Sequence, residues 1–369
     1  MKKKVLILIG DVANGHRSAA NALTDSFEKL FPDEIEIETV DVFTVSRSTQ
    51  PFYSADSTHL LITQNKSVEA FANFFFKFFN TSFGYDLFKW FASERLSKTI
   101  VSILEEEKPD VVISIHPIVS GALNEMKADG RFTKKSVTVI TDLITLFRGW
   151  GDTSADLLFA PTTEAVNNLV NFGVDINKIK FPLFPINPRM KNYQSKDTVF
   201  SSLNLDLNKT TVLLTGGGFG IESLKKAIGN IEKKIENIQL ILIAGKNINF
   251  KSYLEDKYKN HKGIRILGYV NNMQDFINAS DVVIGKPGPA TILEFELFNK
   301  KAILTKKIGE QEIGNIAYAK SNPNFRYIGE DWGMLEETLK ELISEKVENT
   351  SRRSFDECDQ ITKEIFKLL

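Results

Sequence analysis

Short apolar runs alternate with longer amphipathic segments along most of this 369-residue chain. The clearest run is VLILIG at residues 5–10, and the helix-like segment HRSAANALTDSFEKLF follows it at residues 16–31. Strands that alternate with helices form a parallel sheet with helices on its faces. The alternation therefore predicts an α/β fold.

The length of the chain predicts two domains, because 369 residues are too many for one typical domain. The polar segment at residues 187–209 lacks a sustained period, and we interpret it as a linker that leads into the second domain. We expect domains at residues 1–190 and 191–345, with a C-terminal helix at residues 346–369 that packs back on the first. After residues 5–10, the expected strands are residues 35–43, 108–117, 136–142, 156–162, 178–185, 210–218, 239–245, 264–270, 281–288 and 301–305.

Composition excludes several classes of function. A net charge of −1 gives no general reason to expect a nucleic-acid partner. The single cysteine, Cys358, cannot form an internal disulfide, which indicates a reducing cytoplasm. The start MKKKVLILIG looks like a signal peptide, but its apolar run is short and ends in Gly-Asp, which is typical of a buried first strand. No run approaches the roughly 20 apolar residues that span a bilayer.

The segment from Lys286 to Ala319 is the richest in functional signals. A Gly-Pro-rich turn opens a helix that reads TILEFELF. Free N–H groups and the helix dipole at such a start suit a phosphate or diphosphate. Glu294, on the first turn, would accept hydrogen bonds from a ribose, although a tight strand-to-helix turn also explains the glycines. The residues at the helix start are Gly288, Pro289, Ala290 and Thr291.

A polar loop follows the next predicted strand. Gln311, Glu312 and Asn315 lie close together just beyond the strand AILT. Ligands of open α/β sheets bind outside the carboxyl ends of the strands. We therefore expect these side chains to bind hydroxyl groups in the same crevice as the phosphate.

These two linked motifs carry a resemblance to a known family. KPGPATILEF and GEQEIGN resemble the KxGPGTIxEA and GQExGN motifs of MurG-like (family 28) glycosyltransferases, most closely the monogalactosyldiacylglycerol synthase and processive diacylglycerol glycosyltransferase branch. The resemblance implies two Rossmann-like domains that face each other across a cleft, the GT-B fold. It also implies a UDP-sugar donor held by the second domain.

A second glycine-rich loop, TGGGFGIESL, begins at Thr215. Glycines let the backbone approach a ligand closely, but the spacing is not that of the dinucleotide fingerprint, so we expect no nicotinamide cofactor. The resemblance places Gly217 and Gly218 beside the donor and acceptor. Gly245 has the same position at the end of its own strand. The resemblance implies that Val270 contacts the uracil edge, and plain packing at a strand end is the alternative.

His16 is the predicted base. It follows the first strand and two glycines, Gly10 and Gly15, at the start of a helix. The unperturbed pKa of histidine lies close to neutral, which suits removal of a proton from an attacking hydroxyl. The family carries GGGHR(A/S) here, and this chain keeps Gly-His-Arg-Ser but has Asp-Val-Ala-Asn at residues 11–14 in place of part of the glycine loop.

Two further polar residues follow strands of the first domain. His116 lies in a Ser-Ile-His-Pro segment that matches an S-x-H-P segment of the family, and we expect it in the acceptor cleft. Asp142 ends the strand VTVIT. It would orient His16 or bind the acceptor, or else cap the following turn.

Residues 70–91 are unusually aromatic, since half of these 22 residues are Phe, Tyr or Trp. Asn73, Lys77 and Asn80 form a narrow polar stripe at helical spacing. A helix with so broad an aromatic arc is typical of a membrane interface or an acyl-chain groove, and a core helix is the alternative. The residues expected to contact lipid are Phe75, Phe78, Phe79 and Trp90.

Together with the residues above, the resemblance implies an inverting transfer of a hexose from a UDP-sugar to a lipid hydroxyl, and its closer branch implies diacylglycerol as the acceptor. We expect no metal and no cofactor, and a cytoplasmic enzyme attached peripherally to the inner face of the cell membrane. Three alternatives stay open: a MurG-like N-acetylglucosaminyltransferase acting on a peptidoglycan lipid precursor, a nucleotide-sugar 2-epimerase, and a non-catalytic nucleotide-sugar-binding subunit at the membrane.

Overall fold

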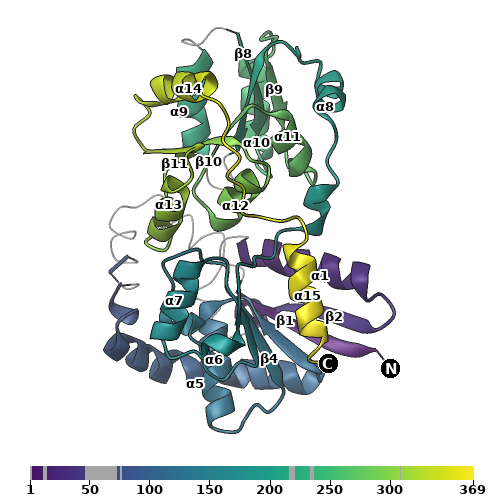
Figure 1. Ribbon diagram of the computed structural model, residues 1–369, viewed down its shortest axis with the longest axis vertical. Coiled ribbons are helices and arrows are strands. Elements are labelled where there is room, and N and C mark those ends of the chain that lie inside the picture. The colour runs from purple at the N-terminus through teal and green to yellow at the C-terminus, as the bar shows by residue number, and fades with distance from the viewer. Residues whose placement is uncertain are drawn as a thin grey trace. The chain divides into compact units, whose positions relative to one another are not determined.

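The chain forms two compact units, each built on its own sheet (Figure 1). The first unit contains residues 1–188, 309–314 and 355–369, and the second contains residues 189–308 and 315–354. The computed structural model describes residues 2–10, 15–45, 73–74, 77–215, 221–232, 237–307 and 309–369.

The first unit has a parallel six-stranded sheet in the order β2-β1-β3-β4-β5-β6. Helices connect the strands, as parallel pairing requires. The elements of this unit are β1 (Lys3–Ile9), α1 (Gly15–Leu30), β2 (Ile35–Asp41), α2 (Val42–Val45), α5 (Ser82–Glu107), β3 (Val111–Ser114), α6 (Pro117–Ala128), β4 (Lys135–Val139), η1 (Arg148–Trp150), β5 (Leu157–Phe159), α7 (Thr163–Asn171), η2 (Ile176–Lys178), β6 (Ile179–Lys180) and α15 (Glu357–Phe366).

Alternate side chains of β1 enter two different cores, because successive residues of a strand point to opposite faces. Val5, Ile7 and Ile9 pack with α1 and α15 on one face. Leu6 and Leu8 pack with α5 and α6 on the other. Both faces of the sheet are therefore buried, which explains why β1 reads as a continuous apolar run.

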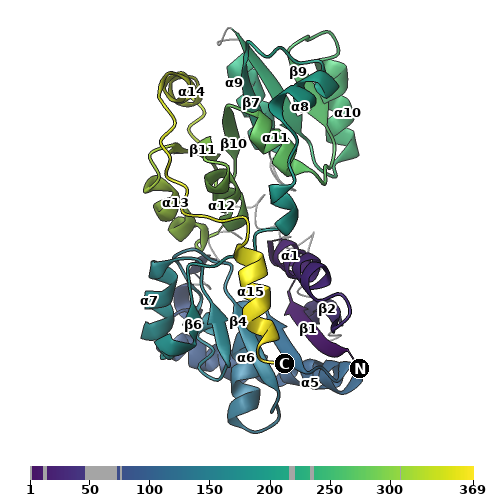
Figure 2. The same ribbon diagram turned by 45° about the vertical axis from the view of Figure 1, so that its right-hand side comes forward.

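The last helix, α15, packs beside α1 on one face of the first sheet (Figures 1 and 2). Cys358 is fully buried there, and its thiol donates to the carbonyl of Ala22. Glu357 accepts a hydrogen bond from the backbone N–H of Phe184, 173 residues earlier in the chain. The helix thus completes the core of the first unit.

The second unit repeats the architecture with a parallel sheet in the order β12-β11-β10-β7-β8-β9. Buried residues of β7, β8 and β10 pack with α9, α10 and α14. The elements are η3 (Pro188–Lys191), α8 (Lys196–Leu203), β7 (Thr210–Thr215), α9 (Ile221–Glu232), β8 (Ile238–Ile243), α10 (Ile248–Lys257), β9 (Ile264–Leu267), α11 (Met273–Ala279), β10 (Val282–Gly285), α12 (Pro289–Leu297), β11 (Lys301–Thr305), α13 (Glu312–Lys320), β12 (Phe325–Gly329) and α14 (Leu335–Ser344).

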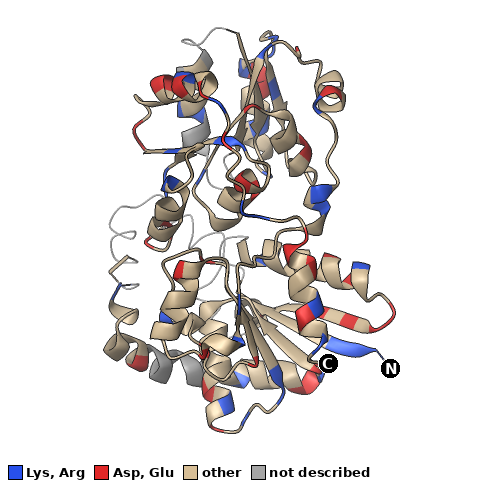
Figure 3. Cartoon of the chain, in the orientation of Figure 1, with Lys and Arg blue, Asp and Glu red and all other residues tan. Residues whose placement is uncertain are grey.

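The predicted fold class, α/β with two doubly wound sheets, is confirmed. Positive and negative side chains are interspersed within each unit, in keeping with the near-zero net charge (Figure 3). Within the described ranges, no helix combines the length and the apolar character needed to cross a bilayer.

Most predicted strands are shorter in the structure, and the ends of β2 and β6 have clear local causes. β2 stops at Asp41, whose carboxylate accepts the backbone N–H of Phe43, and residues 42–45 are helical instead. β6 ends at Lys180, just before the Phe181–Pro182 bond, where proline has no N–H to offer the sheet.

Two predicted segments have a different structure. The predicted linker at residues 187–209 contains α8, which Ser195 caps by accepting the N–H of Thr198. The continuous aromatic helix predicted for residues 70–91 is interrupted: Thr81 caps a new helix, α5, by accepting the N–H of Gly84. Residues 70–72 and 75–76 lie outside the described part of the chain.

Candidate active site

The carboxyl ends of three adjacent strands bring the first unit's candidate residues together. β1 lies between β2 and β3, so residues that follow these strands meet at one edge of the sheet. Gly10 follows β1, Phe43 follows β2 and His116 follows β3. His16, on the first turn of α1, completes the group.

A backbone carbonyl fixes the ring of His16. Its Nδ1 lies 2.9 Å from the carbonyl oxygen of Gly10. A carbonyl can only accept, so Nδ1 carries the proton and donates it. In the neutral ring the lone pair is then on Nε2, which gives His16 the tautomer of a general base that acts through Nε2.

His116 lies beside His16 and is almost completely buried, with 7% of its surface exposed. Its Nδ1 accepts the backbone N–H of Ile118 and so caps α6. The centroids of the two imidazole rings are 4.9 Å apart in an edge-to-face arrangement, and the Phe43 ring meets His116 in the same way at 5.1 Å. Burial, with a smaller contribution from His16, holds the pKa of His116 well below its usual value.

Gly10 allows this cluster to close, a role that the sequence reasoning missed. A Cβ atom at position 10 would lie 2.2 Å from Cε2 of Phe43 and 2.9 Å from Cδ2 of His116. Neither distance is compatible with a side chain larger than hydrogen. The signal was present in the sequence, since a glycine directly after a buried strand often marks a close approach.

Asp142 follows β4, but its hydrogen bonds do not include His16. Its Oδ2 accepts the indole N–H of Trp150 at 2.7 Å. Burial raises the pKa of Asp142 to about 6; the bond from Trp150 opposes this increase, and the negative charge of Glu312 adds to it. In the structure, Asp142 therefore does not orient His16 directly.

The second unit places the predicted phosphate-binding residues at the start of α12. Gly288 is the N-cap and makes no side-chain capping bond, and Pro289 is the first helical residue. A Cβ atom on Gly288 would lie 3.4 Å from Nζ of Lys286, so an ammonium group lies against this helix start. The dipole of the helix and this ammonium both favour an anion here. The sequence reasoning gave Lys286 no role.

Glu294 is on the second turn of α12 rather than the first, because the helix begins at Pro289. Burial raises the pKa of its carboxyl to about 7. Among the described residues, no group donates a hydrogen bond to this carboxylate. A desolvated carboxylate without a protein partner is a candidate for ligand binding.

The GEQEIGN segment forms a helix start rather than a loop. Gln311 is exposed, whereas Glu312 opens α13 and is buried. Asn315, 1% exposed on the same turn, donates from Nδ2 to the carbonyl of Pro287, and its Oδ1 is buried without a hydrogen-bond partner. Asn315 thus ties α13 to the turn that precedes α12.

The other residues predicted to bind the sugar donor add little to the description of the site. Gly245 follows β8 with φ of 65°, a conformation that favours glycine, and Val270 lies partly buried beyond β9. Ala290 and Thr291 continue the first turn of α12, partly buried. Gly217 and Gly218 lie outside the described residues.

The aromatic segment of the first unit is only partly described. Phe75 and the side chain of Trp90 lie outside the described part, and Gly15 is exposed with open space around its Cα. Phe78 and Phe79 are partly buried and pack edge to face, with ring centroids 5.1 Å apart. Phe74 and Phe83 are 65% and 75% exposed. Apolar side chains therefore face solvent on both sides of the break at Thr81.

Asn80 joins this segment to the loop that follows Asp142, a contact that the sequence reasoning also missed. Its Nδ2 donates to the carbonyl of Leu146, and its Oδ1 accepts the N–H of Arg148 at 2.7 Å. The indole that holds Asp142 belongs to the same short turn, η1. Asn80, just before α5, thus links the aromatic segment to the turn that holds Asp142.

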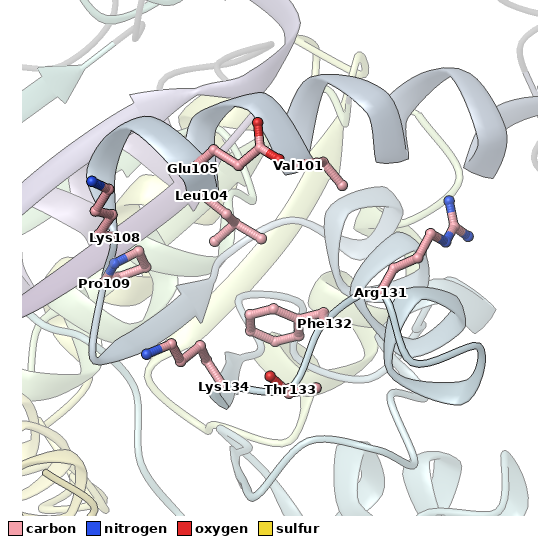
Figure 4. A pocket seen from close by; sticks show the side chains of 9 residues that line it. All are labelled: Val101, Leu104, Glu105, Lys108, Pro109, Arg131, Phe132, Thr133 and Lys134. Carbon is pink, nitrogen blue, oxygen red and sulfur yellow. The ribbon is translucent and has the colours of Figure 1, made fainter.

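A pocket of about 390 Å³ lies at a different place in the first unit (Figure 4). It is lined by the end of α5 and by the residues just before β3 and β4, including Leu104, Lys108 and Phe132. This is the amino edge of the sheet, whereas His16 and His116 lie at the carboxyl edge. Among the described residues, no group of three or more His, Cys, Asp or Glu is arranged to hold a metal ion.

Comparison with known proteins identifies the family. Residues 16–186 match monogalactosyldiacylglycerol (MGDG) synthase, and residues 211–354 match the glycosyltransferase family 28 C-terminal domain. Monogalactosyldiacylglycerol synthase 3 of Arabidopsis thaliana is 30% identical over 337 residues, which cover 87% of this chain and 70% of the plant protein. The chain belongs to the monogalactosyldiacylglycerol synthase family.

Other members and neighbours agree with this assignment. A processive diacylglycerol beta-glucosyltransferase of Staphylococcus epidermidis is 26% identical over 357 residues, covering 94% of this chain and 89% of that protein. The solved structure of MurG from Acinetobacter baumannii superposes with a TM-score of 0.64 at 11% identity and covers 99% of both chains, which supports the GT-B fold. The predicted family and enzyme class, a hexose-transferring glycosyltransferase that forms glycolipids, are confirmed.

Proposed function

We propose that this member of the monogalactosyldiacylglycerol synthase family transfers a hexose from a UDP-sugar to the free hydroxyl of diacylglycerol, with inversion at the anomeric carbon. The observation that carries the proposal is the fixed tautomer of His16, whose Nδ1 donates to Gly10 and whose Nε2 holds the lone pair. The names of the plant and bacterial relatives support the lipid acceptor.

On the acceptor side, Nε2 of His16 takes the proton from the attacking hydroxyl. The hydroxyl oxygen forms a bond to the anomeric carbon from the face opposite the diphosphate, and the bond from that carbon to the diphosphate breaks with its electron pair. Asp142 uses the carboxylate oxygen that Trp150 does not engage to hold the acceptor. Its loop position after β4 suits this role better than contact with His16.

On the donor side, the start of α12 and the ammonium of Lys286 stabilise the departing diphosphate. Glu294 accepts a ribose hydroxyl, and Asn315 keeps the turn before α12 in place. Gln311 and Glu312 hold hydroxyls of the sugar. We propose that these charges act without a metal ion or a cofactor.

The exposed aromatic side chains suggest how the enzyme reaches its lipid. Phe74 and Phe83 would enter the interface of the membrane, near the loop that Asn80 ties to the site. We propose that the enzyme works in the cytoplasm on the inner face of the cell membrane.

The test is product formation in mixed micelles of detergent and diacylglycerol, with labelled UDP-glucose, UDP-galactose and UDP-N-acetylglucosamine supplied separately. One labelled glycolipid is expected, and it would identify the sugar. Its yield should not change when EDTA is added. Absence of lipid product from every donor, with UDP still bound, would contradict the proposed acceptor.

His16→Ala tests the base directly. Turnover should fall about 100- to 10,000-fold, as for other general bases, while UDP binding persists. His261→Ala is the matched control, because His261 is exposed in the second unit, where it accepts the N–H of Gly263 and packs edge to face with Tyr258. Normal turnover by the His16 variant would remove His16 from the proposed role.

A further inference from the structure

The tautomer of His116 is also fixed by the backbone, and in the opposite sense to that of His16. Nδ1 of His116 accepts the N–H of Ile118 at 3.2 Å, so the neutral ring must carry its proton on Nε2. The low pKa of the buried ring agrees with a neutral imidazole. His116 therefore presents a hydrogen-bond donor at Nε2, whereas His16 presents a lone pair at the same atom.

This donor has no partner in the part of the protein that the structure describes. Among the described residues, the side chain of His116 makes no hydrogen bond other than the one from Ile118, and its ring packs edge to face with the rings of His16 and Phe43. The residue exposes only 7% of its surface, so water has little access to the ring. A buried N–H group without a partner costs free energy, and such groups in native proteins call for an explanation.

A ligand oxygen is the explanation that the geometry favours. The ring centroids of His116 and His16 are 4.9 Å apart, so one small polar group can meet both rings. The capping bond prevents His116 from accepting a proton at Nδ1, and its Nε2 is already protonated. His116 therefore cannot act as a second base, but it can donate to the molecule that His16 deprotonates.

We propose that His116 donates its Nε2–H to an oxygen of the lipid acceptor that neighbours the attacking hydroxyl, and so selects acceptors with oxygens on adjacent carbons. A 1,2-diacylglycerol meets this requirement through the ester oxygen next to its free hydroxyl. The proposal rests on the proposed function. His16 removes the proton from one oxygen, and His116 fixes the direction of the acceptor through the next.

Two substitutions separate donation from helix capping. In His116→Asn, the side-chain oxygen replaces Nδ1 and keeps the cap on α6, since Asn is a preferred N-cap residue, but the donor is lost. In His116→Gln, the amide nitrogen reaches the position of Nε2 and keeps the donor, but the cap is lost. One variant therefore keeps only the capping role of His116, and the other keeps only its role as a donor.

The measurement is the KM for diacylglycerol and for the UDP-sugar in mixed micelles, together with the Tm of each variant. We expect His116→Asn to raise the KM for diacylglycerol about tenfold, which corresponds to ~1.4 kcal/mol, without changing the KM for the donor. His116→Gln should keep the KM for diacylglycerol close to that of the wild type despite a lower Tm. A purely structural role predicts the reverse, with His116→Asn normal and His116→Gln impaired.

A second readout keeps this inference distinct from the proposed function. In protein labelled with ¹⁵N-histidine, NMR should assign the neutral Nε2–H tautomer to His116, using His116→Asn for the assignment. Proton occupancy of Nδ1 at neutral pH would overturn the inference whatever the activity. If the wild type makes no glycolipid, the proposed function fails; if it makes glycolipid and both variants have the wild-type KM, only the role of His116 fails.

Discussion

Replacement of Asp142 by Asn should make the protein more stable and less active. The pKa of Asp142 is about 6 in the folded protein, against an ordinary value of 3.8. At 1.36 kcal/mol for each pH unit, keeping this carboxylate ionised costs the folded state about 3 kcal/mol at neutral pH. Asn has a similar shape, and its carbonyl oxygen can still accept the indole N–H of Trp150. Asp142→Asn should therefore gain up to about 3 kcal/mol at pH 7.5.

The pH dependence of stability follows from the direction in which the pKa of Asp142 is shifted. Between pH 3.8 and 6, the unfolded chain releases the proton of Asp142 while the folded protein keeps it, so wild-type stability falls as the pH rises. The gain in Asp142→Asn should accordingly shrink to about 1 kcal/mol at pH 4.5. Turnover should be lower than in the wild type at both pH values, because the acceptor loses a charged partner.

Asp156→Asn is the matched control, and it should change the stability in the opposite direction. Burial alone would raise the pKa of Asp156, but bonds from Lys127, Lys135 and the N–H of Ser136 outweigh it and hold the pKa at about 2. Its carboxylate contributes stability that is present above pH 3.8 and lost as the pH falls towards 2, so the control should lose about 2 kcal/mol at both pH values.

Urea unfolding at pH 7.5 and 4.5, followed by tryptophan fluorescence, measures both variants. Trp150 is fully buried in the first unit and reports on its unfolding. A loss of stability in Asp142→Asn at pH 7.5 would refute the reasoning. It would mean that the carboxylate stabilises the fold, and that its burial is no evidence for function.

Three other variants test the remaining geometry. Gly10→Ala should force Phe43 away from a Cβ atom that would lie 2.2 Å from its ring, and kcat should fall without a change in UDP affinity, as measured by calorimetry. UDP affinity of the wild type should rise as the pH increases through about 7, because Glu294 ionises there and becomes a better hydrogen-bond acceptor. Glu294→Gln should abolish this pH dependence. The same pH dependence in the variant would exclude Glu294 from UDP binding. Tyr318→Phe should lower the stability of the second unit by about 1–3 kcal/mol in thermal unfolding, because the buried carboxylate of Glu296 loses a donor at 2.6 Å; an unchanged Tm would contradict this.

Much of the fold could be predicted because its parallel strands are buried on both faces. The runs at β1 and β8 are apolar at almost every position and end in glycine or polar residues, so they stand out from the helices. β12 was missed, since its sequence FRYIG has only two fully apolar positions beside a tyrosine and a charge. α8 was missed because its stability comes from tertiary contacts, such as the burial of Phe200, rather than from periodicity.

The candidate site was predictable in its residues but not in its bonds. His16 and His116 each follow a strand, which is enough to place them at one edge of a parallel sheet. That they touch depends on the order β2-β1-β3, which no local pattern encodes. The partner of Asp142 lies eight residues further on, in a short turn whose path is set by packing. Sequence alone therefore left the role of Asp142 open and did not predict its bond to Trp150.

The return of α15 to the first unit has a consequence for how the protein is made. Ile361 and Ile365 fill the core beneath α1, and Glu357 serves a backbone N–H of a residue 173 positions earlier. The ribosome synthesises the whole second unit before it reaches this helix. Domains usually fold in the order in which they emerge, but here the unit that emerges first lacks part of its core until the last helix is made. During that interval the apolar surface that α15 covers in the folded protein is open to solvent and to other chains.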